Sequence, residues 1–294
     1  MLFTFTKTTV MKSTICLTIL PLLIASCSAS ETQLTEKGNL SLKEVSGLEY
    51  INGSLYALED SGNKNSIYKL SATGKTEEEI VIANAKNKDW EEMTSDKDGN
   101  LYIGDFGNND NERKDLAIYK LNANNLSTVT SVISFYYPEQ KAFPPKKSNL
   151  IYDAEAFFEH NGNFYLFTKN RSKGFNGEVQ VYKIPNKQGN HAAQLLGTLQ
   201  TCDNFRKCAI TGADISPDGT KVVLLSGDKV WLLTNFGKDN FAKGSLQPLE
   251  LNHWSQKEGI CFKDNDTLTI ADEKAKKEGG KLYEVKLSDL LEAK

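Results

Sequence analysis

The stretch DWEEMTSDKDGNLYIGDFGNND, residues 89–110, decides the fold of this chain. It begins with acidic residues, continues as a short strand, turns at Asp98-Gly99, returns as a second strand and ends in a loop of Gly, Asn and Asp. Asp-Gly between two alternating apolar runs is a strong signal for a tight β-hairpin. The stretch therefore predicts an antiparallel hairpin with polar, largely acidic segments at its open end.

Variants of this phrase recur along the chain. They begin at Ser46, Asp89, Tyr152, Thr211 and Lys257. Each adds a third strand with a Tyr or Trp near its middle, and a fourth strand is expected at 79–83, 130–136, 194–199 and 245–251. Four antiparallel strands per repeat are typical of a β-propeller blade. We therefore predict an all-β chain with a single β-propeller over residues 39–294.

The number of blades and the closure of the ring also follow from the repeats. Five blades are favoured, and six is the alternative if residues 137–151 hide another blade. The last repeat lacks its own fourth strand before the chain ends. A strand within residues 33–42 is expected to supply it, since pairing the two ends of the chain removes an open sheet edge.

The N-terminus is predicted to be a targeting segment. Lys7 and Lys12 precede an apolar run over 15–25 that is too short for a permanent membrane span, and the run ends in Ala25-Ser26-Cys27. This ending looks like the lipobox of bacterial lipoproteins. We expect residues 1–26 to be the signal peptide, Cys27 to carry lipid that tethers the protein to a membrane, and residues 27–38 to be a leash. The alternative is an ordinary secretory signal with Cys27 incidental.

The composition and the lipobox resemblance indicate which cellular location and which binding partners to expect. Lys+Arg 35 against Asp+Glu 38 leaves no general basic surface, so nucleic acid is not an expected partner. The lipobox resemblance implies a lipid-anchored protein of the bacterial cell envelope, and Ser28 favours the outer membrane by resemblance to known sorting behaviour. In an exported protein, Cys202 and Cys208 predict a loop disulfide. Cys261 lies in an apolar pattern and is predicted to be buried.

Acidic residues recur where the first strand of each repeat begins and the second ends. The candidate metal ligands are Glu49, Glu92, Asp105, Glu155, Asp214 and Glu258. The candidate ligand-binding residues are Asp60, Asp89, Asn108, Lys169, Arg171 and His253. Carboxylates and amide oxygens suit a hard cation such as Ca²⁺. The alternative is that the acids accept hydrogen bonds from backbone amides and that the cations pair with the acids.

The phrases DWEEM, LYIGDFGNN, YDAEAF, TGADISPDG and KEGICF resemble the blade motifs of a group of bacterial lipoprotein propellers, over about residues 46–273. Those motifs read as variants of D-W-E-D, G-D-x-G-D-N, D-A-E-A, T-G-A-D-x-S-x-D-G and E-G-I. The group is similar to the "esterase-like activity of phytase" propellers and, more distantly, to regucalcin and gluconolactonase.

The resemblance implies two enzymatic activities. Phytase propellers hydrolyse phosphate esters with calcium ions in an acidic channel. Gluconolactonase-type propellers hold one divalent metal through a first-blade Glu, which Glu49 matches. However, this chain has Thr211-Gly212 where that family places Asn-Gly, so one metal ligand is missing and lactonase activity is less supported.

Two functions are compatible with these residues. The favoured one is an envelope lipoprotein whose acidic loop face binds a small anionic ligand or an envelope protein, with Ca²⁺ as the expected ion. Its basis is that the sequence shows no serine-hydrolase elbow and no phosphate-cradling glycine loop. The alternative is a Ca²⁺-dependent hydrolase of phosphate or carboxylic esters, with Glu92, Asp105 and Glu155 as metal ligands and Lys169 or Arg171 holding the anion.

Overall fold

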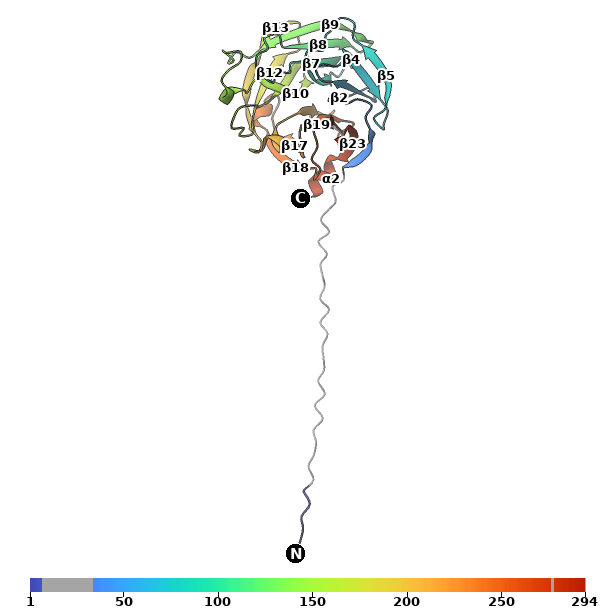
Figure 1. The fold of residues 1–294 in the computed structure, drawn as a ribbon, viewed down its shortest axis with the longest axis vertical. Coiled ribbons are helices and arrows are strands. Elements are labelled where there is room, and N and C mark those ends of the chain that lie inside the picture. Colours follow the sequence, from blue (N-terminus) through green and yellow to red (C-terminus); the bar gives the residue numbers. More distant parts are fainter. Residues whose placement is uncertain (7–33, 276–277, 294) are drawn as a thin grey trace. The chain divides into compact units, whose positions relative to one another are not determined.

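The structure, a computed structural model, describes residues 1–6, 34–275 and 278–293. Residues 34–293, apart from 276 and 277, form a ring of five antiparallel sheets, a five-bladed β-propeller (Figure 1). The fold predicted from the repeats is thus confirmed. The lipidation site predicted at Cys27, and most of the predicted signal peptide, lie outside the described residues. No helix among the described residues has the length and apolar character needed to cross a bilayer.

Each blade uses four strands that follow one another from the channel outward. Blade 1 contains β2 (Val45–Ile51), β3 (Ser54–Glu59), β4 (Ser66–Leu70) and β5 (Thr76–Val81). Blade 2 contains β6 (Trp90–Ser95), β7 (Leu101–Asp105), β8 (Ala117–Asn122) and β9 (Asn125–Tyr136). Blade 3 contains β10 (Asp153–His160), β11 (Asn163–Lys169), β12 (Glu178–Pro185) and β14 (Gln194–Gln200). Blade 4 contains β15 (Gly212–Ile215), β16 (Val222–Ser226), β17 (Lys229–Thr234) and β18 (Ser245–Glu250).

Blade 5 closes the ring with both ends of the chain. Its strands are β19 (Lys257–Phe262), β20 (Thr267–Asp272), β23 (Lys281–Lys286) and, from the N-terminus, β1 (Thr35–Asn39). β1 pairs antiparallel with β23, Thr35 opposite Glu284 and Asn39 opposite Lys281. The predicted closure is confirmed. Residues 35–38, predicted to be part of the leash, belong to this strand instead.

Insertions add few elements to the ring. β13 (Gly189–Ala192) pairs in parallel with the outer strand β9 of blade 2. Residues 137–151 hold only the 3₁₀ turn η1 (Lys147–Asn149), so they contain no sixth blade. The other short elements are α1 (Phe205–Cys208), η2 (Phe241–Lys243), the small hairpin of β21 (Lys274–Ala275) and β22 (Glu278–Gly279), and α2 (Leu287–Glu292).

Large apolar side chains pack between neighbouring blades. Phe106 of blade 2 meets Phe157 of blade 3 edge-on, with ring centroids 5.1 Å apart. Phe241 and Phe158 join blades 3 and 4 in the same manner, at 5.1 Å. Buried aromatic pairs combine large apolar burial with a preferred geometry. They hold the blades at fixed angles around the channel.

Small residues occupy one shared position on the inner strands of four blades. Gly47, Ala156, Gly212 and Gly259 occupy the same register position as Glu92 in blade 2. A Cβ on Gly47 would lie only 2.6 Å from Glu92 Oε1 and 2.9 Å from the Glu92 Cα. Glycine is therefore required for this close approach. The Glu92 side chain fills the space that the small residues leave.

Candidate cation site at the mouth of the channel

A β-bulge turns one residue of the inner strands toward the mouth of the channel. In four blades the strand register skips a single residue, namely Ser46, Glu91, Glu155 and Glu258. Thr211, directly before β15, has the corresponding place in blade 4. Bulges commonly re-aim a side chain beside a functional site. Here all five residues line one cavity of about 450 Å³.

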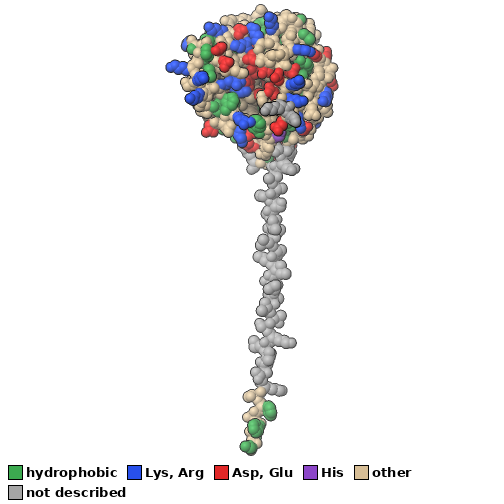
Figure 2. All heavy atoms as spheres, in the orientation of Figure 1, with side chains coloured by type: hydrophobic (Ala, Val, Ile, Leu, Met, Phe, Trp, Pro, Cys, Tyr) green, Lys and Arg blue, Asp and Glu red, His purple; other side chains and the backbone are tan. Residues whose placement is uncertain are grey.

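The cavity has an acidic lining with cations beside it. Asp60, Lys169, Gly227 and Glu273, each of which directly follows or ends the second strand of its blade, line it together with the bulge residues. In the space-filling view, Asp and Glu side chains gather at the centre of the ring face shown, with Lys and Arg around them (Figure 2). The cavity volume lies in the range of small-molecule and ion sites.

The six carboxylates predicted as metal ligands do not come together. Glu155 and Glu258 are bulge residues of the cavity, whereas Glu92 lies one residue deeper along its strand. Glu49 and Asp214 lie three residues beyond the bulge position of their strands, and both line a separate cavity of about 910 Å³ at the other end of the channel. The repeats predict that the five strand acids are equivalent. That prediction is wrong, because the acids lie at different distances along the strand from the bulge position that the blades share.

The deeper acids are satisfied by donors of the chain itself. Asp214 accepts from the backbone N–H of Ile215 and of Phe262, both at 2.7 Å. Glu92 accepts from the N–H of Met93 at 3.0 Å and, across the channel, of Ala213 at 3.4 Å. Glu49 accepts from Ser95 Oγ at 3.1 Å. For these three residues the structure supports the alternative, hydrogen-bonding role.

Burial raises the pKa of each deeper acid. Desolvation is the largest cause in all three, and it raises the pKa of Asp214 to about 7. The pKa values of Glu49 and Glu92 are raised well above the usual range, with the neighbouring Asp214 as a further cause. Protonation removes the cost of burying several like charges in one channel. The raised pKa values therefore favour the neutral form of these acids inside the ring.

Asp105 also accepts hydrogen bonds from side chains of the protein. It accepts from Arg113 Nη2 at 2.9 Å and from the Tyr119 hydroxyl at 2.9 Å. The same pairing recurs in blade 5, where the Tyr283 hydroxyl donates to Asp272 at 3.0 Å. An acid at the end of the second strand thus holds a tyrosine of the third strand. This explains the Tyr that the repeats place there.

The two cations expected to hold an anion are instead paired with acids. Arg171 donates to Asp153 and to Glu155, and Lys169 donates to Glu155. Asp153 is fully buried, and Glu155 and Lys169 are nearly so. Buried charges need such partners because their desolvation is costly. Arg171 and Lys169 are therefore engaged in a four-membered network at the edge of the cavity.

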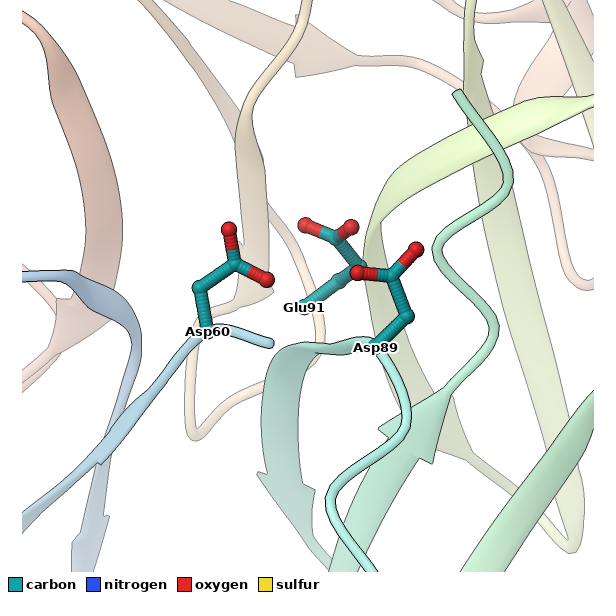
Figure 3. A group of neighbouring side chains, drawn as sticks. All are labelled: Asp60, Asp89 and Glu91. Atoms are coloured by element: carbon teal, nitrogen blue, oxygen red, sulfur yellow. The ribbon is translucent and has the colours of Figure 1, made fainter. Parts of the chain in front are cut away.

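Three carboxylates converge beside this network. Asp60 follows β3 of blade 1, while Asp89 precedes and Glu91 lies within β6 of blade 2 (Figure 3). One oxygen from each carboxylate lies within 4.8 Å of the others. Asp60 and Asp89 are among the predicted ligand-binding residues, and the structure places them together. Glu91 is not among the predicted site residues. The sequence predicts the neighbouring Glu92 instead.

Glu91 is the member of this group without a partner. It is only 6% exposed and lines the cavity. Within 34–275 and 278–293, no hydrogen bond or ion pair reaches its carboxylate. Arg171 attracts it without contact, while its guanidinium donates to Asp153 and Glu155. Burial, and next the charge of Glu155, raise the pKa of Glu91 well above its usual range. A buried carboxylate of this kind is costly unless a cation or a proton compensates it.

The pKa values of the other two carboxylates, Asp89 and Asp60, are also raised. Burial and then Asp60 raise the pKa of Asp89 to about 6. Burial is also the largest cause of the raised pKa of Asp60. Three oxygen donors at this separation suit Ca²⁺, which takes six to eight oxygen ligands and accepts water or a bound molecule among them. The residues present therefore fit a hard divalent cation.

Two further predicted residues lie elsewhere. Asn108 is buried, and its side-chain oxygen accepts from the Arg113 N–H at 2.8 Å, while the next residue, Asn109, lines the cavity. His253 lines a neighbouring cavity of about 610 Å³, with its ring centroid 5.3 Å from that of Tyr283.

Cys202 and Cys208 form a disulfide, and Cys261 is a buried free thiol.

Gly107 sets the positions of the site carboxylates, and its replacement is expected to disturb them. A Cβ there would lie 2.0 Å from Glu91 Oε1 and 2.5 Å from Asp89 Oδ2. We expect Gly107→Ala to displace both carboxylates while the strands keep their places, because only the flexible ends of side chains need to move. If the three carboxylates hold Ca²⁺, the stabilisation of the protein by added Ca²⁺ in thermal unfolding should be smaller in the variant, with little change in stability without Ca²⁺. An unchanged Ca²⁺ response would contradict this placement of the ion.

Comparisons with known proteins add likenesses of fold. No protein-family model matches the chain, and no curated protein sequence matches it. Among solved structures it is similar to the PQQ-bound aldose sugar dehydrogenase of Streptomyces coelicolor, with 10% identity, 85% of this chain and 96% of that chain covered, and a TM-score of 0.49. It is also similar to a gluconolactonase of Xanthomonas campestris, with 14% identity, 82% and 71% covered, and a TM-score of 0.45.

Proposed function

We propose that this protein is a Ca²⁺-binding propeller that holds a small ligand in the cavity at the mouth of its channel. Asp60, Asp89 and Glu91 hold the ion, and water or oxygen atoms of the ligand complete its coordination. The observation that carries the proposal is Glu91, a buried carboxylate that has no hydrogen bond or ion pair among the described residues and lies within 4.8 Å of two others.

Location completes the proposal. A lipid on Cys27 would tether the ring to a membrane of the bacterial cell envelope, the outer membrane being favoured, while the cavity stays open to small molecules of that compartment. A binding role is favoured over the Ca²⁺-dependent hydrolase. The reason is that Lys169 and Arg171, which a hydrolase of this kind would use to hold the anionic group of an ester, are engaged by Glu155 and Asp153.

The test compares Glu91→Gln with the unchanged protein in thermal unfolding, with Ca²⁺ and with EDTA. Ca²⁺ should stabilise the unchanged protein, by about 2.7 kcal/mol at a free concentration about 100-fold above Kd. Glu91→Gln should lose this increment. In EDTA the variant should be at least as stable as the unchanged protein, since it removes a buried carboxylate without a partner.

The opposite directions of these two effects separate loss of a site from general damage to the fold. Asp98→Asn, at an exposed hairpin position away from the cavity, is the matched control and should keep the full Ca²⁺ response. If Glu91→Gln is stabilised by Ca²⁺ as strongly as the unchanged protein, the ion binds elsewhere and the proposal is wrong.

The Ca²⁺ increment should also depend on pH. The raised pKa of Asp89, about 6, means that the folded state holds this proton more tightly than the unfolded chain. Its contribution to stability without Ca²⁺ is therefore present at low pH and lost as pH rises through the folded pKa. Because Ca²⁺ needs the deprotonated carboxylates, its increment should grow from about pH 5 to about pH 8.

The measurement is the difference in unfolding free energy with and without Ca²⁺ at each pH. The lowered pKa values of His160 and His253, due first to burial, give a contribution of the opposite sign. That contribution is the same with and without Ca²⁺, so it cancels in the difference. A Ca²⁺ increment that stays constant over this range would show that the titrating carboxylates do not bind the ion.

A further inference from the structure

One wall of the cavity is aromatic and comes from two loops. The loop closed by the Cys202–Cys208 disulfide contributes Phe205 and Arg206, and the loop between β18 and β19 contributes Trp254. The Trp254 indole N–H donates to the backbone oxygen of Arg206 at 3.1 Å. The Arg206 guanidinium lies over the Trp254 ring, 4.4 Å from its centroid. The two loops thus hold each other at the rim.

Arg206 differs from the other arginines around the channel mouth. Lys257 also lines the cavity without an ion pair, but its ammonium is buried and donates to the backbone oxygens of Gly227 and His253. Arg113, Lys169 and Arg171 all form ion pairs, and the neighbouring Lys207 pairs with Asp228 at 3.2 Å. Arg206 forms no ion pair within the part of the chain that the structure describes. Stacking on an aromatic ring leaves the N–H edges of a guanidinium free, and their planar fork matches an oxyanion in two parallel hydrogen bonds. The rim therefore presents a pre-positioned group for an anion.

The aromatic wall and the three carboxylates lie across the cavity from each other. Phe205 and Arg206 come from the junction of blades 3 and 4, and Trp254 from the junction of blades 4 and 5. Asp60 and Glu91 come from the junction of blades 1 and 2. In a ring of five blades, the junction of blades 1 and 2 lies opposite blade 4, and the other two junctions flank blade 4. A molecule within about 450 Å³ can therefore touch both walls.

We propose that the cavity binds a small molecule with an oxyanion, a carboxylate or a phosphate, on an apolar body. The oxyanion lies on the Arg206 guanidinium, and the apolar body packs on Trp254 and Phe205. Other oxygens of the molecule reach the bound Ca²⁺; this last part alone rests on the proposed function. Arg206 and Trp254 are then the residues that determine which molecules bind, in place of Lys169 and Arg171.

The test uses benzoate, phenyl phosphate and neutral benzamide as probes of the whole protein, by calorimetric titration. Trp254 gives an optical readout of position, because it is 48% exposed whereas Trp90 and Trp231 are buried. A bound probe should protect it from quenching by acrylamide. The oxyanions should bind at least about tenfold more tightly than benzamide, as one charge-assisted contact predicts. The tighter of benzoate and phenyl phosphate identifies the carboxylate or the phosphate as the natural group.

Arg206→Gln should lower the affinity for the two oxyanions by about tenfold or more and leave the affinity for benzamide unchanged. The variant should fold normally, since the side chain is exposed and the contact to the Trp254 N–H uses the backbone oxygen of residue 206. Lys207→Gln, at the next position, which is also exposed, is the matched control and should bind all probes normally. If Arg206→Gln binds the oxyanions as the unchanged protein does, or if benzamide binds as tightly as benzoate, the proposal is overturned.

Repeating the titrations in EDTA separates this proposal from the proposed function. Oxyanion binding that depends on Arg206 both with Ca²⁺ and in EDTA supports the Arg206 site. It would contradict the proposed contact between the bound molecule and Ca²⁺. Oxyanion binding that needs both Arg206 and Ca²⁺ supports the full proposal. If no probe protects Trp254 under either condition, the site on the aromatic wall is wrong, whatever the thermal response to Ca²⁺.

Discussion

Replacing Arg171 by methionine is expected to lower the unfolding free energy by about 3–5 kcal/mol, the usual effect of removing one partner from a buried ion pair. Arg171 donates to both Asp153 and Glu155, and Asp153 is fully buried. Methionine keeps much of the apolar stem but leaves Asp153 without its cation and Glu155 with Lys169 alone. The cost comes from burying these acids uncompensated and not from loss of packing.

Lys173→Met is the matched control, since this exposed lysine lies two residues away in the same loop and its side chain forms no ion pair among the described residues. Its unfolding free energy should change by less than about 0.5 kcal/mol. Chemical denaturation of both variants at neutral pH gives the comparison. Equal, small effects would mean that the network is solvated in solution and that Arg171 is available to a ligand after all.

The sequence was sufficient for the fold because its turn signals are local. Asn52-Gly53 and Asn161-Gly162 adopt the positive φ angles that a tight hairpin turn requires. The strands on either side alternate as expected, and β9, β14 and β18 cover the segments predicted as fourth strands. A feature that depends on neighbouring residues alone can be read from one sequence.

The site was less accessible, because one inserted residue changes which side chain faces the channel. Glu91 and Glu92 are adjacent acids with opposite environments, and only the bulge at Glu91 decides which of them reaches the cavity. A bulge shows in the strand pairing and not in the composition of the strand. The pattern Ser46-Gly47, Thr211-Gly212 and Glu258-Gly259, a polar residue before glycine, was the available signal.

The partner of each charged side chain was also beyond the sequence. Arg113 and Arg206 are both loop arginines, yet Arg113 is paired with Asp105 whereas Arg206 stacks on Trp254, 48 residues further along the chain. Local patterns identify which residues can carry charge at the channel mouth. They do not show which charges cancel, and that decides which groups remain for a ligand.

Removing the closing strand is the second large effect we expect. A chain that begins at Leu40 lacks β1, whereas a chain that begins at Leu34 keeps it. Loss of the ladder between β1 and β23 removes several hydrogen bonds, each worth about 0.5–1.5 kcal/mol net, so the unfolding free energy should fall by about 2–5 kcal/mol. It also leaves β23 as an unpaired edge, which should promote association between molecules.

The comparison that decides this is urea denaturation of the two chains, with sedimentation to follow association. β1 itself buries little apolar surface, since its residues are exposed or half-buried. A loss of stability would therefore come mainly from opening the ring, with a smaller part from Leu34, which packs against the core of blades 4 and 5 and is absent from the shorter chain. If the shorter chain has the same midpoint and stays monomeric, blade 5 is stable with three strands and β1 is not needed to close the ring. If it is destabilised as expected, β1 fastens blade 5 and closes the ring, and the N-terminal strand is required for a stable propeller.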